Sequence, residues 1–103
     1  MNHEYESFRE FYEGYYLPGH SHQYTKLFHL IGLLGASYFA YRLFSSWEWI
    51  NLLYGLLSGY GFAVISHYLF EGNQPATYKY PVYSFFGDFV MVYEILLGRH
   101  KIL

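Results

Sequence analysis

Residues 60–81 read Tyr-Gly-Phe-Ala-Val-Ile-Ser-His-Tyr-Leu-Phe-Glu-Gly-Asn-Gln-Pro-Ala-Thr-Tyr-Lys-Tyr-Pro, an apolar helical pattern that changes into a polar loop with Gly and Pro. His67 and Glu71 lie where the pattern changes, and their spacing of four places both side chains on one face of a helix. An imidazole and a carboxylate presented together are typical of half of a metal site. The other interpretation is a capped helix end with a hydrogen-bonded histidine, and for this pair alone it is favoured.

The composition indicates a small membrane protein. Of its 103 residues 53% are hydrophobic and only 14% are charged, against roughly 25% charged residues in soluble domains. Aromatic residues make up 25%, and the 14 tyrosines suit a membrane interface, where a ring is half apolar and half hydrated. We therefore expect residues 1–103 to form one all-α domain, an integral membrane bundle of about four helices.

Charge and cysteine content narrow the classes of function. A net charge of −2 provides no electrostatic footprint for nucleic acid, so we expect no nucleic-acid partner. The chain has no cysteine, so a metal would be held by His, Asp or Glu. Such ligands favour iron, manganese or zinc.

The first predicted helix covers residues 5–16, where aromatic residues at helical spacing face away from Glu and Arg. This amphipathic helix is expected to end at Pro18-Gly19. A second helix is expected to begin near Ser21 or Thr25, because either side chain can cap a helix. At the other end of the chain, a loop over Gly72–Tyr83 should lead into a last helix. We expect that helix over Ser84–Gly98, with Asp88 as an acidic residue of its first turns rather than a ligand.

Two helices are expected to cross the bilayer. The second helix carries no charge between Lys26 and Arg42. The third, from Glu48 to about Phe70, spans roughly 33 Å at 1.5 Å per residue, which exceeds a hydrocarbon core of about 30 Å. A buried helix of a soluble bundle would show the same pattern, but so small a chain could hardly cover it. Small residues are expected to let the two helices pack closely: Gly32, Gly35, Ala36 and Ser37 in one, and Gly55, Ser58, Gly59 and Gly61 in the other.

The short connection at Ser45–Trp47 makes these helices an antiparallel hairpin, so the start of the second lies beside the end of the third. His3 and His100 lie near the chain termini and do not share this geometry. A single histidine on an apolar face is usually a hydrogen-bonded core residue. Several of them at one membrane face instead favour a metal site. Five candidate ligands are expected to converge there: His20, His22, His29, His67 and Glu71.

Three blocks of residues match a known pattern: His20-Ser21-His22 with His29, then His67 followed by Glu71, Asn73 and Pro75, then Lys79-Tyr80-Pro81 with Gly87-Asp88. Together they resemble a family of small membrane proteins long catalogued as a domain of unknown function. The characterised fungal member is an iron(II)-dependent 2-hydroxy fatty acid dioxygenase. The resemblance covers nearly the whole chain. The sequence departs from the pattern at Thr25, Ser66 and Gln74.

This resemblance implies the activity, its partners and the residues that carry it. The implied reaction uses dioxygen and Fe(II) to shorten a long-chain 2-hydroxy fatty acid by one carbon at the membrane surface. Lys79 or Asn73 would hold the substrate carboxylate. Metal roles fall on His20, His29 and His67, and further on His22 and Glu71.

Two other classes of function fit the same residues. A zinc-dependent lipid hydrolase would use similar ligands, with Glu71 as the base that activates a metal-bound water. A non-enzymatic lipid-binding membrane protein would hold no stoichiometric metal. A di-iron desaturase is less compatible, because two irons need more inward-facing ligands than these helices offer.

Overall fold

The computed structural model describes residues 5–100 and 102, and every described element is helical. The all-α class with four main helices is therefore confirmed. Two of these helices continue into π-helical turns, and two short 3₁₀ turns connect the longer elements. In chain order the elements are α1 (Phe8–Phe11), the π-helix η1 (Tyr12–Tyr16), the 3₁₀ turn η2 (Pro18–His20), α2 (Gln23–Ser46), α3 (Ile50–Ser66), the π-helix η3 (His67–Glu71), the 3₁₀ turn η4 (Ala76–Tyr78) and α4 (Pro81–Leu96).

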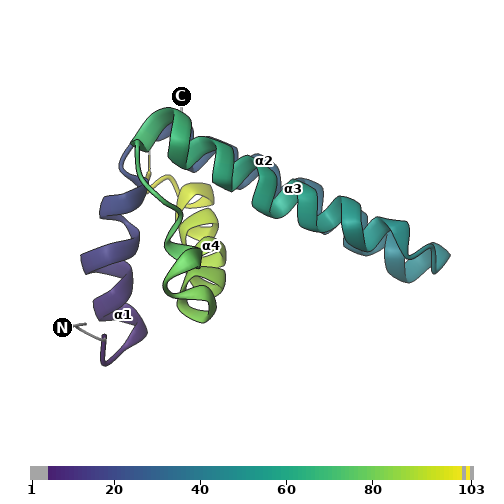
Figure 1. Cartoon of the computed structure of the whole chain (residues 1–103), viewed down its shortest axis with the longest axis horizontal. Helices are drawn as coiled ribbons and strands as arrows, with labels where there is room; N and C mark the ends of the chain where they lie inside the picture. The colour runs from purple at the N-terminus through teal and green to yellow at the C-terminus, as the bar shows by residue number, and fades with distance from the viewer. Residues whose placement is uncertain (1–4, 101, 103) are drawn as a thin grey trace.

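The molecule has the shape of an L (Figure 1). The antiparallel helices α2 and α3 form one long arm, and α1 with η1 and α4 lie side by side at one end of that arm, at a steep angle to it (Figure 1). We call this second part the base. At the tip of the arm Trp47 ends α2 in a left-handed conformation, with φ of 59°, and its N–H donates to the Leu43 carbonyl. This tight turn makes the two long helices antiparallel neighbours.

Small residues allow the close approach of α2 and α3. A Cβ at Gly32 would lie 2.7 Å from the Ser58 carbonyl oxygen, and one at Gly35 would lie 2.1 Å from Ser58 Oγ. Ser58 Oγ in turn donates a 3.0 Å hydrogen bond to the Gly32 carbonyl. Gly61 differs from the expectation, because a Cβ there would meet nothing within 4 Å. It therefore lies outside this contact.

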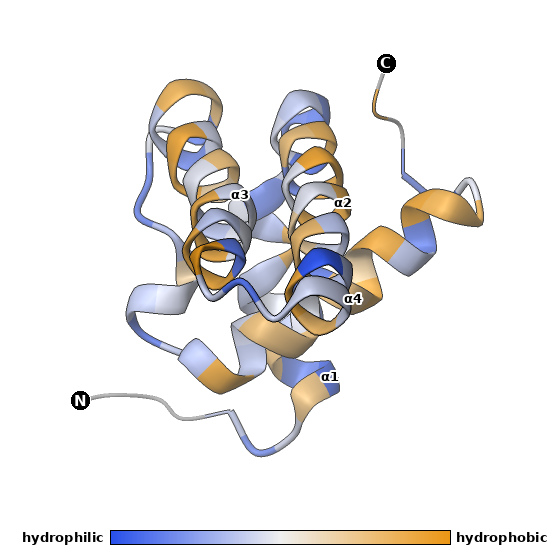
Figure 2. Cartoon of the chain, turned by 90° about the vertical axis from the view of Figure 1, so that its right-hand side faces the viewer, coloured by the Kyte–Doolittle hydropathy of each residue, from blue (hydrophilic) through white to orange (hydrophobic). Residues whose placement is uncertain are grey.

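Both helices of the arm are long and apolar enough to cross a membrane. The two candidate spans are Gln23–Ser46 and Ile50–Glu71, with 24 and 22 residues. Only 17% of the most apolar 18-residue window of each is buried, whereas the core helix of a soluble protein would be mostly buried. Hydrophobic residues recur along the exposed lengths of both helices (Figure 2). Length, composition and exposure of the arm are thus those expected of a membrane hairpin.

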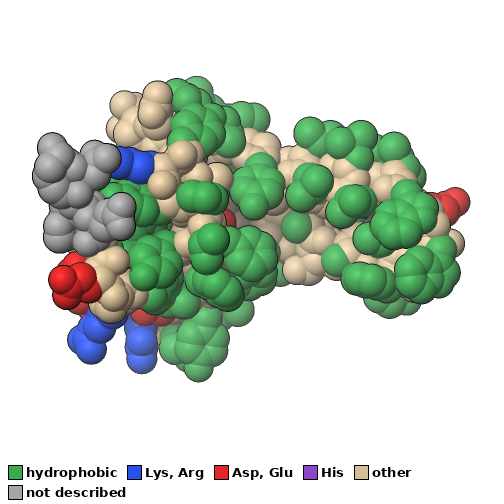
Figure 3. Space-filling view, turned by 60° about the horizontal axis from the view of Figure 1, so that its bottom comes forward, with side chains coloured by type: hydrophobic (Ala, Val, Ile, Leu, Met, Phe, Trp, Pro, Cys, Tyr) green, Lys and Arg blue, Asp and Glu red, His purple; other side chains and the backbone are tan. Residues whose placement is uncertain are grey.

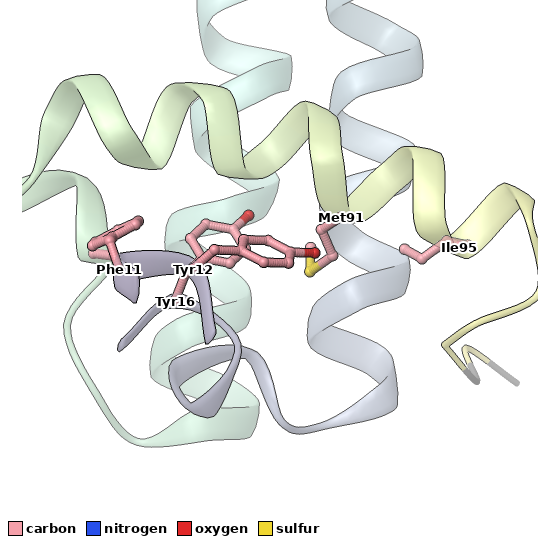
Figure 4. Close-up of a cluster of buried hydrophobic side chains, with 6 residues drawn as sticks. Phe11, Tyr12, Tyr16, Met91 and Ile95 are labelled. Atoms are coloured by element: carbon pink, nitrogen blue, oxygen red, sulfur yellow. The ribbon is translucent and has the colours of Figure 1, made fainter. Parts of the chain in front are cut away.

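The base is held together by a buried cluster of rings and aliphatic side chains between η1 and α4 (Figure 4). Its members are Phe11, Tyr12, Tyr16, Ala76, Met91 and Ile95. Gly87 makes this packing feasible, because a Cβ there would lie only 2.8 Å from the Tyr16 ring. The Tyr16 hydroxyl also donates to the Asp88 carboxylate of α4. These contacts fix the segment that leads into His20.

The starts of the first and last helices differ most from the expectation, by three residues each, and α2 is capped by His22 rather than by Ser21 or Thr25. The first helix begins at Phe8 rather than Tyr5, with Ser7 Oγ accepting the Glu10 N–H as its N-cap. The last begins at Pro81 rather than Ser84, because proline suits a first helical position that needs no N–H donor. The prediction that Asp88 lies in the first turns is therefore wrong. It lies about two turns into α4.

Candidate metal centre

Three imidazoles from three separate elements meet where the base joins the arm. His20 ends η2, His29 lies in α2, and His67 begins η3. The Nε2 atom of His20 lies 3.1 Å from Nε2 of His29 and 3.1 Å from Nε2 of His67. The ligand atoms of all three lie within 4.8 Å of one another, and the three residues are only 1%, 5% and 2% exposed. The structure thus brings together three of the five candidate ligands.

The opposite nitrogen of each ring is held by an oxygen that accepts a hydrogen bond. His20 Nδ1 lies 2.6 Å from the Tyr16 carbonyl, and His29 Nδ1 lies 2.8 Å from the Thr25 carbonyl. His67 Nδ1 lies 2.8 Å from Oδ1 of Asn73. Each Nδ1 therefore carries the proton and donates it, which leaves the lone pair on Nε2.

Three lone pairs that converge in this way repel one another unless a cation lies between them. An imidazole nitrogen binds a first-row divalent ion at about 2.1 Å. At ordinary coordination angles, two such nitrogens are roughly 3.0–3.4 Å apart. The two separations from His20, both 3.1 Å, fall in this range, and all three ligand atoms lie within 4.8 Å of one another. Donor type and tautomer therefore suit a metal ion, and the Nδ1 acceptors are the partners that orient metal-bound histidines.

Neighbouring residues of the base fix the orientation of the His20 ring and shift its pKa. The Tyr16 ring stacks on it with centroids 3.9 Å apart and planes at 16°. Burial is the largest influence, and it lowers the pKa of His20 well below its usual value. The nearby His29 and His67 lower this pKa further, whereas the hydrogen bond to the Tyr16 carbonyl raises it. The ring is therefore neutral at neutral pH, which is the form that coordinates a metal.

Asn73 positions His67, and this role differs from the predicted one of holding a substrate carboxylate. Gly72, with φ of 67°, turns the chain so that the Asn73 N–H donates to the His67 carbonyl at 3.2 Å. The Asn73 amide nitrogen donates to the Gly19 carbonyl at 3.3 Å, which orients its oxygen toward His67. The other predicted carboxylate partner, Lys79, is exposed, with its ammonium 5.9 Å from the centroid of the Tyr80 ring. Neither Asn73 nor Lys79 therefore presents an unused hydrogen-bond donor next to the three clustered histidines.

Glu71 does not join the cluster but ties the end of η3 to the start of α2. Its carboxylate accepts hydrogen bonds from Ser21 Oγ at 3.0 Å, the His22 N–H at 2.7 Å and Thr25 Oγ at 2.6 Å. A carboxylate at this position also interacts favourably with the positive end of the α2 dipole. Both of its oxygens are engaged in this clamp, so the predicted roles as ligand and base find no support in the geometry.

The other histidines lie elsewhere. His22 is exposed and caps α2, its Nδ1 accepting the Tyr24 N–H at 3.0 Å. Because that nitrogen is turned toward the helix start, His22 stands apart from the three clustered imidazoles. His100 bonds to Glu94 at 2.8 Å, and His3 lies outside the described residues.

Two cavities adjoin the cluster on different sides. One of about 220 Å³ is lined by all three histidines together with residues of α4. A second of about 300 Å³ lies on the side of the Gly72–Pro75 loop, where His20 and His67 share it with Asn73 and Gln74. A ligand can therefore approach the Nε2 atoms from a mostly apolar side and from a more polar one.

Two residues of α4 in the first cavity were not predicted to belong to the site. Ser84 Oγ is buried and has no hydrogen-bond partner in the described part of the chain. Asp88 faces the same cavity and accepts from Tyr16; burial raises its pKa to about 6, although the hydrogen bond opposes this. Asp88 belongs to one of the blocks that match the family pattern, but no local pattern indicates that it or Ser84 faces this cavity, because both positions arise where α4 crosses η1 and α2.

The site is a buried cluster of three imidazoles with open space on two sides, and it lies at one end of a long apolar hairpin. These features define a small helical protein with a candidate mononuclear metal centre. A family model agrees with this class. The model of the family described as 2-hydroxy-palmitic acid dioxygenase Mpo1-like matches residues 5–100, and the chain belongs to this family. The family resemblance of the sequence is thereby confirmed. No curated protein and no solved structure is detectably similar to the chain.

Proposed function

We propose that this protein is an iron(II)-dependent dioxygenase that shortens long-chain 2-hydroxy fatty acids by one carbon. The observation that carries the proposal is the convergence of three Nε2 lone pairs in a member of a family named for this reaction. His20, His29 and His67 would hold the ion through these atoms. When bound, the iron would activate dioxygen for cleavage of the bond between C1 and C2 of the substrate.

The chain's own residues prepare this site in three ways. The Tyr16 and Thr25 carbonyls and the Asn73 amide keep the three rings in one tautomer. Burial of the rings excludes bulk water from the cluster. Ser84 Oγ, which lacks a partner among the described residues, is available to donate to an oxygen of the substrate's head group.

The structure gives less support to a zinc hydrolase. That mechanism needs a base beside the metal-bound water, and Glu71 was the candidate. Both Glu71 oxygens are engaged by donors from the start of α2. The Asp88 carboxylate, which faces the adjoining cavity, accepts the Tyr16 hydroxyl.

We also propose that the arm spans a lipid bilayer. Figure 3 shows hydrophobic side chains over much of the arm and of the neighbouring helix, while charged side chains gather mainly at the ends of the molecule. With the arm in the hydrocarbon core, the histidines at its foot lie where lipid meets water. A fatty acid could then present its head group to the cluster while its chain stays among lipids.

Oxygen uptake tests the proposal directly. Wild type reconstituted with ferrous iron should consume oxygen with 2-hydroxypalmitate and release a fatty acid one carbon shorter. His67→Ala should lose this uptake, and His22→Ala, which changes an exposed histidine, should keep it. Metal analysis after anaerobic purification should find one iron per chain. Absence of iron-dependent uptake by folded wild type would refute the dioxygenase assignment for this substrate.

A further inference from the structure

A groove extends along one face of the arm, from His29 toward the tip of the arm. Its volume is about 250 Å³, and its walls come from both long helices. Small residues of both helices line it, namely Ala36, Ala40, Gly55 and Gly59, together with larger apolar residues that include Leu43 and Leu52. A Cβ at Gly59 would lie 3.5 Å from Ala36 Cβ and one at Gly55 would lie 3.5 Å from Phe39 Cβ, so the small residues also bring the two helices close together here.

The groove adjoins the cavity beside the cluster, because His29, Tyr60 and Asp88 line both spaces. Phe85 and Phe89 of α4 also line the groove and come from the base. A ligand with its polar head at the cluster would pass these shared residues to extend an apolar tail along the arm.

The length of the groove matches an acyl chain. From His29 to Leu43 along α2 the distance is roughly 21 Å at 1.5 Å per residue. A lipid chain in one leaflet covers about 15 Å, half of a hydrocarbon core of about 30 Å. At the far end Leu43 and the buried Asn51 line the groove, and the Asn51 amide donates to the Glu48 carbonyl at 3.0 Å. The space is thus long enough for a chain of the size found in membrane lipids.

We propose that this groove binds the acyl chain of the substrate and that the residues near its far end, Gly55 and Ala40, set the longest chain accepted. The identity of the head group rests on the proposed function, but the groove as an acyl site does not. In the bilayer such a chain would lie parallel to its lipid neighbours, so it could enter from the side without leaving the hydrocarbon.

Binding of fatty acids to metal-free protein in lipid nanodiscs tests the groove apart from catalysis. The probe is 2-hydroxypalmitate with a photoreactive diazirine near its methyl end. It should label residues near Leu43 and Leu52, and excess unlabelled palmitate should suppress the labelling. Labelling spread evenly over the exposed faces of α2 and α3 would indicate bulk lipid and overturn the proposal, as would an arm protected by a second copy of the chain.

Filling the groove should shorten the preferred chain. In Gly55→Leu the affinity for 2-hydroxypalmitate should fall at least tenfold, because each methylene excluded weakens binding about fourfold. The affinity for a ten-carbon 2-hydroxy acid should stay within about twofold of wild type. Ala40→Phe, at an exposed position that does not disturb helix packing, should act in the same direction. The matched control is Gly61→Leu, outside the groove, where a Cβ meets nothing within 4 Å.

The outcomes separate the two proposals. If the chain-length shift appears in binding but wild type with iron consumes no oxygen, the acyl groove stands and the dioxygenase assignment fails. If oxygen uptake occurs and both groove variants keep the wild-type preference for chain length, the dioxygenase stands and the groove is overturned.

Discussion

The arm and the base are stabilised by different kinds of contact. In the arm, glycines and serines bring two helix backbones together, and most of the apolar side chains point outward. In the base, aromatic rings fill the interior and tyrosine hydroxyls bond to the carboxylates of Asp88 and Glu94. The arm is therefore suited to lipid on its outside, whereas the base has its own core.

The metal centre lies at the junction of these two parts. His29 and His67 come from the arm, and His20 comes from the segment that the base holds in place. A bound ion would thus join the base to the arm. The two parts supply the ligands separately, so their relative position decides whether the site exists at all.

Removing His20, the metal ligand held by the base, should have the largest effect on metal binding and activity. His20→Ala should lower metal affinity by more than the 10- to 100-fold typical of partners that only orient a ligand, and oxygen uptake should vanish. Chelation of wild type should lower its melting temperature, because a ligand that binds only the folded state stabilises it. Calorimetry with and without chelator measures this shift. An unchanged melting temperature would mean that no ion joins the two parts.

Removing the Glu71 hydrogen bonds to the start of α2 should lower the stability of the fold but leave metal binding unchanged. Glu71→Ala leaves the donors of Ser21, Thr25 and the His22 N–H without their acceptor, so we expect a loss of roughly 1.5–3 kcal/mol in the free energy of unfolding. Metal content per folded chain should remain as in wild type. Loss of metal with stability unchanged would instead make Glu71 a ligand.

Removing the hydrogen bond between His67 and Asn73 should lower metal affinity moderately. Asn73→Ala removes the acceptor of the His67 Nδ1 proton, and such changes cost about 10- to 100-fold in metal affinity. Competition with a chelator of known affinity measures it. Gln74→Ala is the control, because this neighbour is exposed. Equal metal affinity in the two variants would show that Asn73 does not position the ring.

The smallest of these effects is expected from crowding Tyr16 within the base. Gly87→Ala places a Cβ 2.8 Å from the buried ring, so it should cost about 1–3 kcal/mol in the free energy of unfolding and weaken metal binding through His20. Gly61→Ala, where a Cβ within α3 meets nothing, should leave metal binding unchanged and should stabilise the fold by about 0.5–1 kcal/mol, because alanine favours a helix over glycine. If the Gly87 variant lost stability but bound metal normally, the Tyr16 stack would have no part in holding His20.

Much of the arm was predictable because its signals are local. Uncharged runs define the helices at Gln23–Ser46 and Ile50–Ser66, and the short turn between them makes them antiparallel. That pairing alone predicts that His29 and His67 lie near each other. The start of α4 was predicted three residues too late, because the loop pattern continued past Pro81. The Tyr16 contacts were not predicted, since nothing near Tyr16 in the chain indicates which helix it meets.

By itself, the sequence determined the helical class, the two long apolar helices, and the end of the hairpin at which the histidines gather, because periodicity and the absence of charge act over neighbouring residues. Only the tertiary structure decided which candidates share one centre. Glu71 and His22 make hydrogen bonds at the start of α2. His20 reaches the cluster because Tyr16, which is held in the base, stacks on its ring and accepts its Nδ1 proton. Side-chain direction at a site depends on partners far away in the chain, and no local pattern contains those partners.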